Sequence, residues 1–122
     1  MKLKNKKIMK IFIICTLSIT ISYCIYNKFY NINAIPEGKF INEIQSPKND
    51  YNLKTYLIDG GSLSANAIRI ELININTQEK KNIYFNYPEE NVEMVWKSDY
   101  IVDINGIELN ILKDYYDWRK NK

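Results

Sequence analysis

The residues best suited to chemistry lie in a loop of small residues, in which a glycine pair precedes a serine and, further on, an arginine. Glycine-rich loops can hold phosphate, but a P-loop also needs a lysine and a following helix whose amino-terminal amides face the anion. Here a strand-like alternation follows, so we expect a wide strand connection whose glycines permit positive φ angles. If the domain has a binding face, we predict that it includes Asp59, Gly60, Gly61, Ser62 and Arg69.

Carboxylates form two further groups, which are Glu89, Glu90 and Glu93 at a turn and the pair Asp99 and Asp103. Paired carboxylates can hydrolyse glycosides or bind calcium, but no EF-hand spacing is present, and solvated turns are the favoured interpretation. The chain has no histidine, which is the commonest general base and metal ligand. Ser62 and Ser64 therefore lack their usual activating base. We predict no catalytic residue, no metal site and no cofactor.

Arg69 and Glu71 are two positions apart, which places both on one face of a strand. The simplest interpretation is a solvent-facing ion pair that contributes little to stability. A buried Arg69 would instead be a specific anchor for a carboxylate.

The charge of the chain is divided between two unlike regions. Of the 17 basic residues, five lysines lie within the first ten positions, and none of the 14 acids precedes Glu37. The rest of the chain is therefore slightly acidic, which argues against a nucleic-acid partner.

The first part of the chain has the composition of a membrane anchor. Residues 11–26 contain no charge, proline or glycine, and a helix counted from Ile8 would be about 28 Å long, near the thickness of a bilayer core. The preceding lysines predict a single-pass protein of the cell membrane, with a cytoplasmic amino terminus and the carboxy-terminal domain outside. A cleaved signal peptide and a lipoprotein remain as alternatives, although Tyr23 before Cys24 spoils the lipoprotein pattern.

Both cysteines, Cys15 and Cys24, fall within this apolar segment. Nine positions apart on a helix, they are too distant for a disulfide, and small apolar residues in lipid are the favoured interpretation. We divide the chain into a basic tail (1–10), an anchor (11–26), a tether (27–36) and an extracytoplasmic β domain (37–122).

The β domain shows hydrophobic alternation with a period of two, interrupted by turns. Asn105-Gly106 between two alternating runs is a strong hairpin signal, and it pairs Ile104 with Ile107, Val102 with Leu109 and Tyr100 with Ile111. Residues 112–122 form either a helical turn or an irregular strap over a sheet edge. The sequence therefore predicts an all-β fold, a small antiparallel meander sheet or sandwich of about seven short strands. The aromatic residues expected to fill its core are Phe40, Tyr51, Tyr56, Phe85, Tyr87 and Trp96.

Several short motifs follow one another in a characteristic order. They are S-P-x-x-x-Y from Ser46, Y-L-x-x-G-G from Tyr56, A-I-R-x-E-L from Ala67, K-N-I-Y-x-x-Y from Lys81, Trp96, I-N-G-x-x-L from Ile104 and Y-D-W from Tyr116. In this order, over residues 36–118, the chain resembles the DUF5412 family. The resemblance implies a small protein of low-GC Gram-positive bacteria with an amino-terminal hydrophobic segment, and it implies no activity and no site residues.

Two functions of different classes fit these observations. The first is a non-catalytic module anchored by its helix, which binds a protein, peptide or envelope component through its loops or a sheet edge. The second is a carboxylate-dependent hydrolase that acts on an envelope polymer. The first is preferred.

Overall fold

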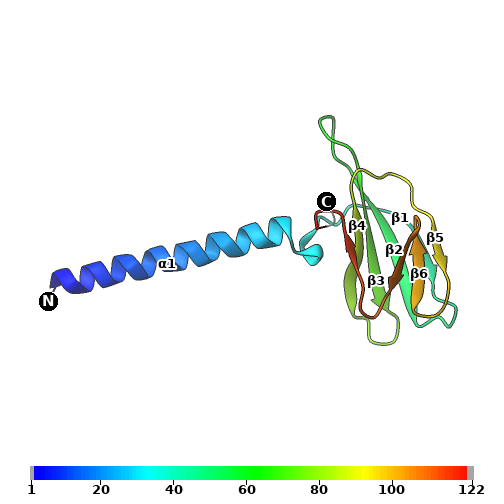
Figure 1. The fold of residues 1–122 in the computed structure, drawn as a ribbon, viewed down its shortest axis with the longest axis horizontal. Helices are drawn as coiled ribbons and strands as arrows, with labels where there is room; N and C mark the ends of the chain where they lie inside the picture. The colour runs from blue at the N-terminus through cyan, green and yellow to red at the C-terminus, as the bar shows by residue number, and fades with distance from the viewer. Residues whose placement is uncertain (1, 121–122) are drawn as a thin grey trace. The chain divides into compact units, whose positions relative to one another are not determined.

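The computed structural model describes residues 2–120 and divides the chain into two compact units, Met1–Ala34 and Ile35–Lys122 (Figure 1). Within the described residues, the first unit holds a helix and a short 3-10 turn, and the second holds all the strands. We call the second unit the β domain.

The first unit is built on α1, which runs from Lys2–Phe29 and is followed by the 3-10 helix η1, Ile32–Ala34. The helix is thus longer at both ends than its uncharged segment. Its hydroxyl groups bond back one turn, with Thr16 Oγ1 donating to the Phe12 carbonyl and Ser18 Oγ to the Ile14 carbonyl, both at 2.9 Å. A hydroxyl group in an apolar helix is costly when its donor has no partner. Here each hydroxyl group finds an acceptor within the helix. Cys15 and Cys24 are both free thiols.

The larger sheet of the β domain has five strands in the order β1-β2-β3-β4-β8. Its strands are β1 (Lys39–Gln45), β2 (Tyr51–Ile58), β3 (Ala67–Asn74), β4 (Lys80–Asn86) and β8 (Tyr116–Asp117). The first four form an antiparallel meander, and β8 pairs in parallel with β4. The tail therefore contains a strap that covers a sheet edge, one of the two forms expected for it. Residues 121–122 lie outside the described residues.

The smaller sheet has three antiparallel strands in the order β5-β6-β7. They are β5 (Met94–Trp96), β6 (Ile101–Ile104) and β7 (Ile107–Asn110). The register pairs Ile104 with Ile107 and Val102 with Leu109, and the Ile111 amide donates to the Tyr100 carbonyl at 2.9 Å. The predicted hairpin is therefore confirmed in register as well as in position.

The core lies between the two sheets, where branched aliphatic side chains alternate inward. Its buried members are Leu53, Ile68, Ile70, Leu72, Ile83, Tyr84, Val102, Ile104, Leu109 and Ile111. The predicted all-β architecture is confirmed over residues 2–120, which form eight short strands in two sheets after one apolar helix. We call the opposite side of the five-stranded sheet, which faces away from this core, its outer face.

The expectation that six aromatic residues fill the core was correct for Tyr51 and Trp96, which pack against it, and wrong for Phe40, which is 49% exposed. A β-bulge between Phe40 and Asn42 shifts the register, so that Phe40 pairs with Tyr56 on the outer face. A second bulge opposite Ile70 and Glu71 does the same for β4. One extra residue moves the side chains that follow to the opposite face.

After the second bulge, Tyr84 lies in the core, and Phe85 lies on the outer face opposite Arg69. Tyr56, Phe85 and Tyr87 are only partly buried. Phe85 and Tyr87 both contact the ring of Trp118. The aromatic residues of the outer face therefore pack against one another and against the carboxy-terminal strap.

Candidate functional site

The loop between β2 and β3 holds four of the five residues predicted to bind a ligand, and it is braced by its own side chains. The Asp59 carboxylate accepts a hydrogen bond from the Gly61 amide at 2.7 Å, and Ser64 Oγ donates to the Gly60 carbonyl at 2.7 Å. Gly61 has a φ angle of +74°, as expected of a glycine in such a turn. Gly60 is required for a different reason, because a Cβ atom there would lie 2.0 Å from the Ala65 carbonyl oxygen.

The loop is also bonded to the segment that follows β4. The Ala65 amide donates to the Tyr87 hydroxyl at 3.3 Å, and Asn66 Nδ2 donates to Glu90 Oε1 at 3.3 Å. The Glu89 amide in turn donates to the Asn66 carbonyl at 3.0 Å. The loop therefore has a defined shape, although most of its side chains face solvent.

Arg69, the fifth predicted residue, lies in β3 with its side chain buried on the outer face of the sheet. Its Nε and Nη2 atoms donate to the Glu37 carbonyl at 3.1 and 2.6 Å, and Nη1 donates to Asn82 Oδ1 at 2.8 Å. The pairing with Glu71 exists, at 3.3 Å, but the prediction that it faces solvent was wrong. The Glu37 carbonyl, ahead of β1, and the ring of Tyr56 both contact the Arg69 guanidinium.

The structure thus brings together Asp59, Gly60, Gly61 and Ser62 in one loop but engages the Arg69 side chain elsewhere. The donors of Arg69 are bonded to the protein's own carbonyl and amide oxygens and to Glu71. The Arg69 side chain therefore holds the segment ahead of β1 against the sheet. A binding role for the five predicted residues stays a prediction.

Four of the five carboxylates considered for hydrolysis accept hydrogen bonds within the protein, namely Glu89, Glu90, Asp99 and Asp103. Asp99 accepts from the Lys48 amide at 3.1 Å and pairs with the Lys48 ammonium at 3.4 Å, while Asp103 accepts from the Gly106 amide at 2.8 Å. Within residues 2–120, no three His, Cys, Asp or Glu side chains gather into a group that could hold a metal ion. No observed geometry favours the hydrolase hypothesis.

Glu89 belongs to a partly buried network beside the core. The Tyr84 hydroxyl donates to Glu89 Oε1 at 2.7 Å, and Asn86 Nδ2 donates to Glu89 Oε2 at 2.7 Å. Burial raises the pKa of Tyr84 far above its usual value, and the hydrogen bond to Glu89 and its negative charge raise it further. Tyr84 therefore remains a neutral donor whose hydroxyl satisfies the carboxylate.

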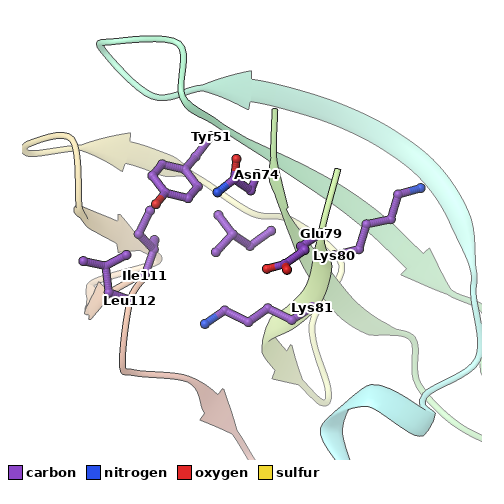
Figure 2. Close-up of a pocket in the computed structure, with 8 residues that line it drawn as sticks. Tyr51, Asn74, Glu79, Lys80, Lys81, Ile111 and Leu112 are labelled. Atoms are coloured by element: carbon purple, nitrogen blue, oxygen red, sulfur yellow. The ribbon is translucent and has the colours of Figure 1, made fainter. Parts of the chain in front are cut away.

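A hollow of about 200 Å³ lies at the other end of the sheet from the predicted loop (Figure 2). Its floor is formed by the buried side chains of Leu72 and Ile111 and its walls by Tyr51 and Leu112. The polar residues that line it are Asn74, Glu79, Lys80 and Lys81. Figure 2 shows the Lys81 amine directed toward Ile111 and Leu112, while the Lys80 side chain points away.

The sequence alone does not reveal this hollow, because the polar run at residues 76–81, NTQEKK, is typical of a turn between two strands. In the structure β4 already begins at Lys80, and Lys81 is paired with Leu72 of β3. Lys81 therefore projects on the side of the sheet that carries the core. The sequence contains one signal of this position, because Lys81 stands two positions before the core residue Ile83. The faces of β4 cannot be assigned, however, until the position of the bulge is known.

Residues 4–121 match the sequence model of a family described as a family of unknown function, DUF5412. The match covers nearly the whole chain. The chain belongs to the DUF5412 family. Comparison with curated proteins and with solved structures gave no match.

The range that matches the DUF5412 model includes residues of both structural units, the apolar helix and the β domain. The helix is a candidate membrane span by length and composition, and its large apolar side chains are exposed. The description of the family names no binding or catalytic residues.

Proposed function

We propose that this DUF5412 protein is a single-pass membrane protein whose β domain is a non-catalytic binding module on the outer side of the cell membrane. The anchor is supported by a helix of 28 residues whose apolar side chains are exposed within the chain. The lysines of the first ten residues favour a cytoplasmic amino terminus. Protease treatment of intact cells tests this topology, and protection of the β domain would contradict it.

The hollow between Tyr51, Leu72 and Ile111 is the observation that carries the binding function. It combines an apolar floor with hydrogen-bonding groups and both signs of charge at its rim. It also lies at the end of the sheet where β3 ends and β4 begins, whereas the chain enters β1 at the opposite end. The end with the hollow is therefore separated from the point of attachment by the length of the strands.

A short peptide segment with one small apolar side chain fits this hollow best. The side chain would rest on Leu72 and Ile111, and the peptide amides and carbonyls would meet the polar groups of Asn74, Glu79 and Lys81. Small ligand sites commonly have such an apolar lining with a few placed polar groups. The hollow is small, and we therefore expect it to take a single side chain of a longer partner, which is a protein or a peptide of the envelope.

The test is a selection of peptides from a displayed random library on the full chain in lipid nanodiscs. Leu112→Asp alters the wall of the hollow, and Val95→Asp is its matched control, because the two residues are 56% and 52% exposed. We expect enriched peptides to bind the wild type and Val95→Asp equally and to lose binding to Leu112→Asp. Equal binding to all three proteins, or no enrichment, would refute the hollow as the peptide site.

A further inference from the structure

The tip of the loop between β2 and β3 carries Leu63, whose side chain is 99% exposed. Figure 1 shows this loop, drawn in green, extending beyond the ends of the neighbouring strands. Isolated exposed leucines are ordinary on protein surfaces. This one differs in that the loop beneath it is held in shape by the bonds of Asp59, Ser64 and Asn66.

An amphipathic pair of aromatic rings lies at the base of the same loop. The Tyr87 hydroxyl accepts from the Ala65 amide at 3.3 Å, and the ring of Tyr87 lies 5.1 Å from that of Trp118. Tyrosine and tryptophan are the residues enriched where a protein crosses the boundary between lipid and water. A leucine at the tip of the loop and a Tyr-Trp pair at its base form an arrangement that suits the boundary between lipid and water.

The connection to the anchor enters the β domain at the base of this loop. Gly38 lies against the Leu57 carbonyl and the Ile58 side chain at the end of β2, and Arg69 binds the Glu37 carbonyl beside it. From Phe29, where α1 ends, to Gly38 the chain advances nine residues, which span at most about 30 Å when fully extended. The connecting segment therefore limits the separation between the end of α1 and Gly38 to about that length.

We propose that Leu63 inserts into the interfacial region of the membrane that holds α1 and so gives the β domain a second point of attachment. This inference rests on the proposed membrane anchor. A single leucine buries little apolar area, but the covalent tether removes most of the entropy lost by a free protein on binding, so a weak contact is sufficient. The contact limits rotation of the β domain about its tether and directs the hollow at the opposite end toward solvent.

The experiment measures lipid contact with the full chain in nanodiscs that contain nitroxide-labelled lipids. A fluorescent label is attached to one cysteine at a time, at native Cys15 in the helix, at Ser62→Cys beside the tip, or at Val95→Cys on β5. Cys24→Ser is present in every protein, and Cys15→Ser in the last two. Because the label at Ser62→Cys leaves Leu63 intact, Leu63→Asp can be added to the same labelled protein.

We expect lipid quenching at Cys15 and at Ser62→Cys, none at Val95→Cys, and loss of the Ser62→Cys quenching when Leu63→Asp is added. Quenching at Cys15 without quenching at Ser62→Cys would overturn the loop contact while leaving the anchor intact. Quenching at Ser62→Cys that persists with Leu63→Asp would exclude Leu63 as the inserted residue. Absence of quenching at Cys15 would refute the anchor and, with it, this inference.

Discussion

The guanidinium of Arg69 on β3 lies over the ring of Tyr56 on β2, with its Cζ atom 4.1 Å from the ring centre. This stacking occurs on the outer face of the sheet, where the same guanidinium binds the Glu37 carbonyl and Asn82 Oδ1. A planar cation with several donors can satisfy all these partners at once, whereas a lysine ammonium cannot. Arg69 thereby joins the segment that precedes β1 to the middle of the sheet.

Replacement of Arg69 by alanine should destabilise the β domain by about 3 kcal/mol, because Glu71 would be left as a partly buried charge without its partner. Arg69→Lys should recover only part of this loss. Lys54→Ala is the control on the same face, since its 4.0 Å contact with Glu43 is partly exposed, and it should change stability by less than about 0.5 kcal/mol. Urea unfolding followed by tryptophan fluorescence measures all three. Equal effects of Arg69→Ala and Lys54→Ala would contradict the assignment.

Burial of Tyr84, together with its hydrogen bond to Glu89, should make stability depend on pH in the alkaline range. Because the pKa of Tyr84 is higher in the folded chain than in the unfolded chain, the stabilisation is complete below the unfolded value, about 10, and is lost as pH rises above it. The loss has a limiting slope of about 1.4 kcal/mol per pH unit. Tyr84→Phe lacks this dependence.

At neutral pH we expect Tyr84→Phe to be less stable than the wild type by about 2 kcal/mol, because Glu89 loses its donor. The difference should shrink between pH 10 and pH 11. Urea midpoints of both proteins across this range provide the measurement, and the other tyrosines cancel in the comparison. A difference that is constant with pH would show that Tyr84 does not titrate as inferred.

The two adjacent glycines of the loop should respond differently to alanine. Gly61→Ala meets open space and suffers only from its positive φ angle, which costs about 1 kcal/mol. Gly60→Ala places Cβ against the Ala65 carbonyl oxygen, so the loop must change shape. Amide hydrogen exchange of Ala65 and Asn66 in the full chain should therefore accelerate strongly in Gly60→Ala and weakly in Gly61→Ala. The reverse order would disprove the braced loop.

Asn105 combines a backbone and a side-chain role in the β6–β7 turn. Its φ angle is +50°, its Oδ1 accepts from the Glu93 amide at 2.8 Å, and its Nδ2 donates to the Asn91 carbonyl at 3.1 Å. Asn105→Ala should lose about 2 kcal/mol of stability, from the side-chain bonds and the strained backbone together. Asn105→Gly removes the bonds but tolerates the φ angle, so it should be the milder variant in thermal unfolding. Equal destabilisation by Asn105→Gly and Asn105→Ala would show that the φ angle does not affect stability.

Local patterns predicted the strands and the hairpin well, because turn residues and alternation act over short distances. Asn105-Gly106 fixed the register of β6 and β7, and the pairing of Val102 with Leu109 followed from it. The faces of β1 and β4 were not predictable in the same way. Each contains a bulge of one extra residue. As a result Phe40 and Phe85, which were expected in the core, lie on the outer face of the sheet.

The environment of Arg69 and the hollow depend on contacts between distant segments. Glu37 and Arg69 are 32 positions apart, and no local pattern connects them. The walls of the hollow come from the start of β2 and from the residues after β7, so it exists only when the two sheets have packed. The loop was identified from sequence, whereas its fully exposed Leu63 became notable only when its neighbours were known to be bonded.

The two-residue strand β8 closes one edge of the larger sheet with residues from late in the sequence. Strands β1 to β4 follow one another along the chain, but the second edge of β4 is covered only by Tyr116 and Asp117, some thirty positions later. Without them an exposed strand edge is open to other chains. A chain that lacks Tyr116 and Asp117 would therefore be prone to aggregate through the open edge of β4.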